Sequence, residues 1–314
     1  MTGADDPRRA ANRERFRAAA ADERPDLALL CLLIGAEAAG PEHGAAQPDR
    51  PEHGGAAVDE AQIELDRLAG LLPARLRGRG GAGSPRGAAG AGATGEADPR
   101  AWAEALRELL GAREGFHGTP GDYRRLDSSL LQAVLHRRRG LPILLSVVWT
   151  EVARRAGAPV YGVGLPGHFV VGFGDPLGDH VLADPYAGGA LLGDHDVAEI
   201  VARATGSPAP VTPGMLRPAG PLDVVLRVLN NIRAWAAARP EQSAVQLWAL
   251  DLSLLLPHRP LRLRLERARL LVERGDFRAG ARELEAYADV AGEVEPQSAD
   301  AVRREAREAR ARLN

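Results

Sequence analysis

His168 and Asp184 are the residues of this sequence best suited to acid–base chemistry at one shared site. Each lies at the edge of a short apolar run typical of a β-strand: Phe169–Phe173 follows the histidine, and a second run ends at the aspartate. If Gly172 faces His180 in an antiparallel hairpin, the same register places His168 opposite Asp184 on one face. Side chains opposed in this way lie close enough to interact, whereas a shift of one residue would separate them.

An enzyme built on this pair also needs a nucleophile. Cys31, the only cysteine, lies in an apolar run far from the histidine in sequence, where a buried structural thiol is the default. Ser146, in the helix expected after Pro142, is the serine candidate. A serine is a weak nucleophile without a base at hydrogen-bond distance. Ser146 also lies one turn beyond the helix N-terminus, where the electrostatic field of the helix dipole has largely faded. A packing role for Ser146 and a structural role for His168 therefore remain open.

Metal and cofactor sites find little support in the sequence. His168, His180, His195 and Asp184 are near one another in sequence, but no pair has the short helical spacing of a zinc motif. We therefore expect neither a metal nor a cofactor.

Composition narrows the functional classes. The 314 residues are 45% hydrophobic, enough for a full core. Forty basic and 42 acidic residues leave a net charge of −2, so no general field recruits nucleic acid or an anionic membrane. A single cysteine excludes an intrachain disulfide, no signal peptide is recognisable, and no apolar run approaches the ~20 residues of a membrane span. We expect a cytoplasmic protein with no nucleic-acid or membrane partner.

The first half of the chain alternates helical patterns with low-complexity sequence. Apolar spacing predicts helices over 26–38, 58–77 and 101–111. Segments 39–57 and 78–97 are predicted to be disordered inserts, because the first repeats Pro-Glu-His-Gly and the second contains eight glycines. Residues 1–25 are expected to be poorly ordered.

Residues 127–184 are predicted to form helices followed by strands. Asp127-Ser128-Ser129 offers a cap for a helix from Leu130, closed by the basic triplet Arg137-Arg138-Arg139 and by Gly140 in a left-handed turn. An alternative role for the triplet is that one arginine faces the cleft and pairs with a carboxylate. Pro142 suits the first turn of the next helix. Three strands, Val160–Val163, Phe169–Phe173 and Val181–Asp184, then predict an α+β fold with an antiparallel sheet.

The last third is predicted to be entirely helical. Prolines mark a linker over 206–221, and a helical tail follows over 222–314. Stretches 243–257 and 277–291 are offset by 34 residues, which is the tetratricopeptide period. A generic helical hairpin is the alternative.

Three motifs in this order resemble a bacterial branch of the transglutaminase-like superfamily, in which a transglutaminase-like core precedes a tetratricopeptide-like tail. The core would span 26–205. The motifs are Arg137-Arg138-Arg139-Gly140-Leu141-Pro142, Gly164-Leu165-Pro166-Gly167-His168-Phe169 and Asp184-Pro185-Tyr186-Ala187-Gly188-Gly189.

This resemblance implies a papain-like arrangement of a nucleophilic cysteine at a helix N-terminus, a histidine base and an orienting aspartate. His168 and Asp184 carry over. The cysteine position falls within Pro142–Leu144, where no residue is a nucleophile. We therefore expect a non-catalytic module that binds a protein or peptide. The alternative is an amide or peptide hydrolase, or an acyl transferase, in which His168 and Asp184 activate Ser146 or a water.

Overall fold

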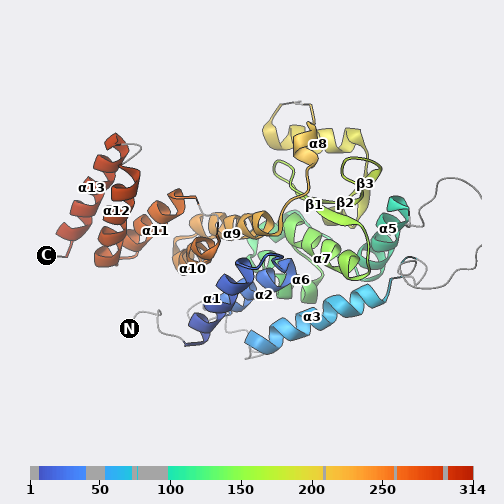
Figure 1. Cartoon of the computed structure of the whole chain (residues 1–314), viewed down its shortest axis with the longest axis horizontal. Helices are drawn as coiled ribbons and strands as arrows, with labels where there is room; N and C mark the ends of the chain where they lie inside the picture. Colours follow the sequence, from blue (N-terminus) through green and yellow to red (C-terminus); the bar gives the residue numbers. More distant parts are fainter. Residues whose placement is uncertain are drawn as a thin grey trace, which may run out of the picture. The chain divides into compact units, whose positions relative to one another are not determined.

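The structure of the chain, a computed structural model, describes residues 7–39, 54–72, 76, 98–207, 210–257, 260–292 and 296–313. The chain forms two compact units, a core unit of residues 27–35 and 51–224 and a tail unit of residues 1–26, 36–50 and 225–314. Figure 1 labels most of their helices and strands. Most of the two predicted inserts lies outside the described residues, but residues 54–57 belong to a helix.

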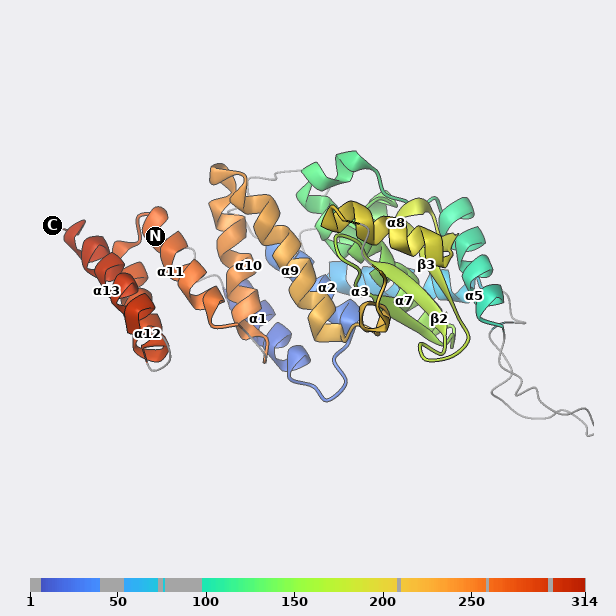
Figure 2. The same ribbon diagram turned by 90° about the horizontal axis from the view of Figure 1, so that it is seen from above.

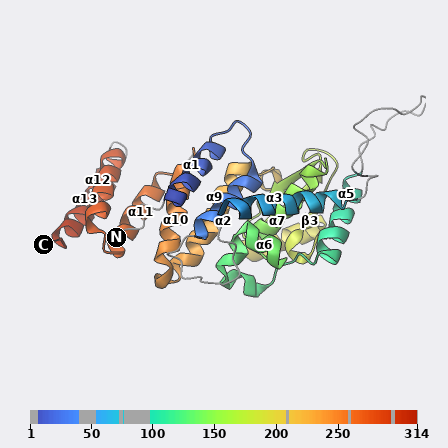
Figure 3. The same ribbon diagram turned by 90° about the horizontal axis from the view of Figure 1, so that it is seen from below.

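In the core unit, α3, α5 and α6 pack against α7, whose apolar sequence leaves 11 of its residues buried. Trp149 of α7 is fully buried and meets Phe116 edge to face, with ring centroids 5.9 Å apart. Helix α3 lies along α7 and also contacts α6 (Figure 3). The helices of this unit are α2 (Leu27–Ala38, which ends in the tail unit), α3 (Gly54–Gly70), α5 (Pro99–Leu106, continued by a π-helical segment Arg107–Arg113), α6 (Leu131–Arg137), α7 (Pro142–Arg155) and α8 (Asp194–Thr205).

The sheet is an antiparallel meander in the order β1-β2-β3-β4, with strands β1 (Val160–Val163), β2 (Val170–Gly174), β3 (His180–Asp184) and β4 (Ala190–Leu192). The α+β class and the antiparallel sheet are confirmed. The expected β2–β3 register is wrong by two residues, because Gly172 faces Leu182 and Gly174 faces His180. A shift of two keeps each side chain on its expected face, since faces alternate with a period of two. Strand β4 was not predicted.

Helix α8 covers one face of the sheet and α7 packs against the other (Figure 2). The α8 side is sealed by buried apolar residues, among them Val170, Leu182 and Val201. The expected linker 206–221 adds to this layer: Met215 packs against it, and Pro218 forms a β-bridge with Val163. The described part of this segment is thus bound to the sheet.

Helix α6 ends differently from its predicted closure. Arg138, not Gly140, takes the left-handed conformation, with φ = 59°. Its guanidinium donates to Glu64 at 2.6 Å and to the Leu135 carbonyl at 2.7 Å, and it stacks on Phe116. These contacts hold a conformation that an L-residue otherwise avoids. Asp127-Ser128-Ser129 is also not a simple cap, because Leu126–Ser129 forms a 3₁₀-helix and Leu130 is the N-cap.

The tail unit includes the N-terminal segment, whose structure differs from the prediction. The expectation of poor order fails for residues 7–20, which form α1, because Phe16 is fully buried and two arginines of α1 bind a buried carboxylate. That carboxylate is Glu37, which pairs with Arg9 at 3.2 Å and with Arg13 at 2.8 Å. The unit's other helices are α9 (Pro221–Ala237, begun in the core unit), α10 (Ser243–Leu255), α11 (Arg262–Glu273), α12 (Phe277–Ala291) and α13 (Pro296–Ala311).

The 34-residue offset coincides with two helices of the tail, α10 and α12. Gly275 has φ = 87°, and the side chain of Asp276 caps α12 by accepting from the Ala279 amide at 3.1 Å. Helices α11, α12 and α13 share a small core that includes Ala268, Leu284 and Ala306. None of the described helices is both long and apolar enough to cross a membrane.

Arg138 generates a stability prediction. Arg138→Ala removes the ion pairs and keeps the left-handed strain, whereas Arg138→Gly removes both. We expect Arg138→Gly to be more stable than Arg138→Ala by about 1 kcal/mol, because glycine adopts positive φ without a Cβ clash. Urea denaturation followed by tryptophan fluorescence measures the difference. Equal stability of the two variants would show that the positive φ carries no strain.

Candidate functional site

A tight turn delivers His168 to the sheet. The His168 amide donates to the Leu165 carbonyl at 3.2 Å, with Pro166 and Gly167 at the two central positions and φ = 65° at the glycine. Proline followed by a residue of positive φ is the signature of a type II turn. The motif Leu165-Pro166-Gly167-His168 therefore encodes the turn, and the turn fixes where the imidazole enters the site.

Asp184 meets His168 at the end of β3. The His168 Nε2 and Asp184 Oδ2 lie 2.9 Å apart, and both side chains are largely buried. Continuing the observed register by one residue places Asp184 opposite Val170, so His168 is its diagonal neighbour. Diagonal positions are about 7–8 Å apart at Cα, which long side chains can bridge. The pair therefore meets despite the two-residue shift.

The second oxygen of Asp184 is used by the backbone. Oδ1 accepts the Tyr186 amide at 2.9 Å and so caps the 3₁₀ turn Pro185–Ala187. The Asp184 carbonyl accepts the Gly189 amide at 2.8 Å. Because both ends of the residue are anchored, the carboxylate can rotate little, and its direction toward His168 is set by the chain around it.

Ser146 is brought near the site, but its hydroxyl points to the backbone. It is fully buried in α7, and its Oγ donates to the Phe169 carbonyl at 3.1 Å. Its contact is thus with the residue next to His168. The hydroxyl ties α7 to the start of β2, which agrees with a packing role.

The other residues considered for chemistry lie elsewhere. Cys31 is buried in α2. His180 sits at the opposite end of β3 from Asp184, and His195 is 86% exposed on α8, 3.3 Å from Glu199. Among the residues that the structure describes, no three His, Cys, Asp or Glu side chains gather as metal ligands would.

Two tyrosines extend the site beyond the residues that the sequence indicated. The Tyr186 ring meets the His168 ring edge on, with centroids 6.0 Å apart, and Tyr123 meets Tyr186 at 6.2 Å. Burial is the main cause that raises the pKa of Tyr186 to about 12, and burial together with the charge of Asp184 raises the pKa of Tyr123. Both phenols therefore remain protonated donors at neutral pH. Tyr186 stood within the Asp-Pro-Tyr motif, but no local pattern marked Tyr123.

Two arginines of the triplet bind the carboxylate of Asp122, the residue before Tyr123. The Asp122 carboxylate is buried and receives Arg137 at 3.3 Å and Arg139 at 3.5 Å. With Arg138 bound to Glu64, all three arginines of the triplet pair with a carboxylate, while the expectation that one of them faces the cleft stays a prediction. Burial alone would raise the pKa of Asp122, but hydrogen bonds from Thr119 and Ser128 and the charge of Arg139 outweigh it and lower that pKa.

Family profiles identify the two parts of the chain. The profile of the transglutaminase-like superfamily matches residues 59–230, more than half of the sequence. The chain belongs to the transglutaminase-like superfamily. A tetratricopeptide-repeat profile matches residues 232–314. The transglutaminase-like core followed by a helical repeat tail, expected from the sequence, is confirmed.

Individual proteins are similar to part of this chain. A UPF0162 protein of Xylella fastidiosa is 33% identical over 182 residues, covering 57% of this chain and 63% of that protein. A UPF0162 protein of Pseudomonas aeruginosa is 37% identical over 117 residues, covering 37% and 42%. Mouse F-box only protein 21 is 34% identical over 68 residues, covering 22% and 11%. The chain thus spans less than two thirds of the length of each of these relatives.

Asp122 generates a pH prediction. Because its pKa is lower folded than unfolded (about 3.9), its stabilisation is fully present above the unfolded value and is lost as pH falls through the folded one. We expect Asp122→Asn to cost about 2 kcal/mol at pH 7, since two half-buried arginines lose the charge of their partner, and less near about pH 3. Urea denaturation at both pH values measures this. The exposed Asp59→Asn is the control, and a pH-independent cost for Asp122→Asn would contradict the assignment.

Gly118 generates a second prediction for the site. A Cβ on Gly118 would lie 1.9 Å from Cδ2 of Tyr186, whereas one on Gly121 would meet nothing closer than 3.7 Å. Gly118→Ala should therefore displace the Tyr186 ring, shift the imidazole resonances of His168 in NMR spectra, and cost about 1–3 kcal/mol by overpacking. Gly121→Ala should leave the resonances in place. Unchanged His168 resonances in Gly118→Ala would show that the ring does not determine the imidazole's environment.

Proposed function

We propose that this chain is a non-catalytic transglutaminase-like protein whose core and helical tail bind a protein or peptide. The N-terminus of α7 carries this proposal. The resemblance assigns the nucleophilic thiol to this turn, but Pro142, Ile143 and Leu144 occupy it and are buried. Cys31 is buried in another helix, so it cannot form a thioester with a substrate without local unfolding.

The aromatic residues beside the pair support a binding role. Tyr123 keeps 52% of its surface exposed while its ring contacts Tyr186, which in turn contacts His168. An exposed tyrosine held by a neighbouring ring offers apolar area and a hydroxyl at small entropic cost, which suits a binding anchor. The repeat tail supports a protein partner, because tetratricopeptide arrays commonly present a surface to other proteins. In our proposal the protein works in the cytoplasm, in keeping with its single thiol.

The His168–Asp184 contact favours a second candidate, hydrolysis of an amide or peptide, or transfer of its acyl group. With the proton of the neutral imidazole on Nε2 and donated to Asp184, Nδ1 is the nitrogen that can accept a proton. A water activated in this way would attack the carbonyl carbon and pass its proton to His168, which would return it to the leaving amine. Ser146 could replace the water only after giving up its bond to the Phe169 carbonyl and becoming accessible.

Chemical labelling tests the absence of an activated nucleophile. We expect the folded protein to take up neither a serine-directed fluorophosphonate nor iodoacetamide, and Cys31 to be alkylated only in denaturant. Ser146→Ala and His168→Ala are the comparison variants. Fluorophosphonate labelling of the wild type that both substitutions abolish would establish a serine enzyme and overturn the proposal.

Selection from a displayed peptide library tests binding. We expect a consensus peptide whose affinity falls about tenfold in Tyr123→Ala, the typical loss for a truncated aromatic anchor. Ile63→Ala, which removes an exposed side chain of α3, is the control and should bind normally. Mass spectrometry of the peptides after incubation should find them intact. Cleavage that disappears in His168→Ala would favour the hydrolase instead.

A further inference from the structure

The turn between β2 and β3 holds an apolar side chain out in solvent. Leu177 is 96% exposed, the highest value among the large apolar residues that the structure describes. Its amide donates to Asp175 Oδ1 at 2.9 Å, and the Gly178 amide donates to the Asp175 carbonyl at 3.0 Å. The Asp175 amide closes the turn on the Asp179 carbonyl at 3.0 Å. A single exposed leucine is ordinary, but a leucine on a braced turn between two carboxylates is pre-organised for docking.

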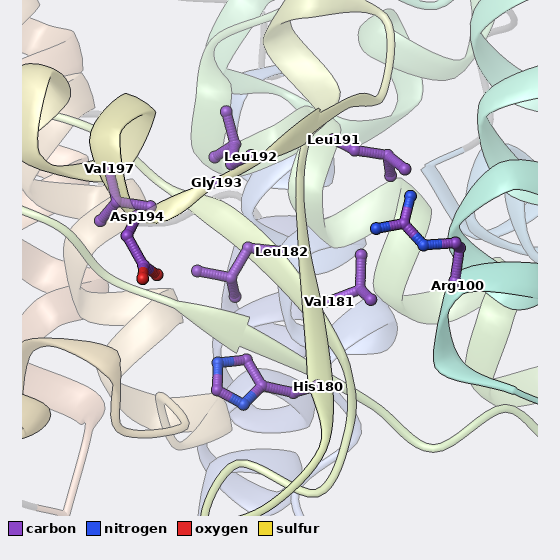
Figure 4. Close-up of a pocket in the computed structure, with 9 residues that line it drawn as sticks. All are labelled: Arg100, His180, Val181, Leu182, Leu191, Leu192, Gly193, Asp194 and Val197. Atoms are coloured by element: carbon purple, nitrogen blue, oxygen red, sulfur yellow. The ribbon is translucent and has the colours of Figure 1, made fainter.

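A pocket of about 330 Å³ opens beside this turn (Figure 4). It forms because β4 stops at Leu192, opposite Leu182, while β3 extends to His180. The edge of β3 is therefore uncovered at Val181. Five of the nine residues around it are apolar, and Leu182 and Val197 among them are buried; the five are Val181, Leu182, Leu191, Leu192 and Val197.

Charged side chains lie at both sides of this pocket. Figure 4 shows Arg100 on one side of β3, and His180 and Asp194 on the other. Arg100 is 60% exposed and has only a 3.8 Å ion pair with Glu104 within its own helix. Arg100 is the permanently charged cation of this lining, so it is the group best placed to receive an incoming carboxylate.

The turn and the pocket belong to one continuous surface. His180, which lines the pocket, follows the turn directly in β3. On the other side, a Cβ on Gly174 would lie 2.7 Å from Cγ of Pro99, the residue before Arg100. The patch carries an exposed leucine with carboxylates next to a pocket that has both apolar residues and a cation. Such a patch is complementary to itself, which is the requirement of an isologous dimer.

We propose that two copies of this chain associate through this patch. Leu177 of each copy enters the pocket of the other, and Asp179 of each pairs with Arg100 of the other. Asp179 is the carboxylate available for this pairing, because the side chain of Asp175 already braces the turn. The patch is small, so the dimer is reversible and in the micromolar range.

Sedimentation velocity of the purified chain between about 1 and 200 µM tests the proposal in the range expected of a small interface. We expect the wild type to shift from monomer to dimer with concentration and Leu177→Asp to remain monomeric. Ile63→Asp, the same kind of change at an exposed position of α3, should dimerise like the wild type. A wild type that is monomeric throughout, or a Leu177→Asp variant that still dimerises, would overturn the proposal. Circular dichroism confirms that each variant is folded.

A charge exchange tests the pairing across the interface. Arg100→Asp should raise the dissociation constant about tenfold or more, because it opposes like charges across the interface. Adding Asp179→Arg to the same chain restores opposite charges and should recover most of the wild-type affinity. A double variant no tighter than Arg100→Asp alone would reject this pairing.

Discussion

The site depends on the carboxylate of Asp184, whose two oxygens serve different parts of the chain. One oxygen lies 2.9 Å from His168, and the other accepts the amide of Tyr186 and so starts the turn that follows β3. The same turn carries the Tyr186 ring that meets the imidazole. One anchored side chain therefore positions the histidine, the turn after β3 and the Tyr186 ring.

Asp122 is a second buried carboxylate that acts on this site. Asp122 binds Arg137, the last residue of α6, and Arg139 just after it, and the charges of both Asp122 and Arg139 act on the Tyr186 phenol. Removing the arginines would cost more than the net attraction of the pairs, because the buried carboxylate would lose its partners away from water. Arg138, which has a left-handed backbone, pairs with Glu64 instead.

In our proposal, α7 has a structural role and supplies no nucleophile. Its buried apolar surface organises the core, and its first turn, where the resemblance assigns a thiol, is filled with apolar side chains. A helix terminus can stabilise a thiolate only where a thiol is present. What remains beside it is a histidine–carboxylate pair and an exposed tyrosine, a combination suited to binding a peptide and, with a water as nucleophile, to hydrolysis.

The sequence determined the elements and the family, because helical periodicity, strand alternation and turn residues act over a few neighbours. It therefore predicted α7, β1 and the approach of His168 to Asp184. Only the tertiary structure decided the β2–β3 register, the helix at the N-terminus and the place of Tyr123, because each depends on partners distant in the chain. Long-range packing and buried ion pairs choose among locally equivalent arrangements, and no short pattern records that choice.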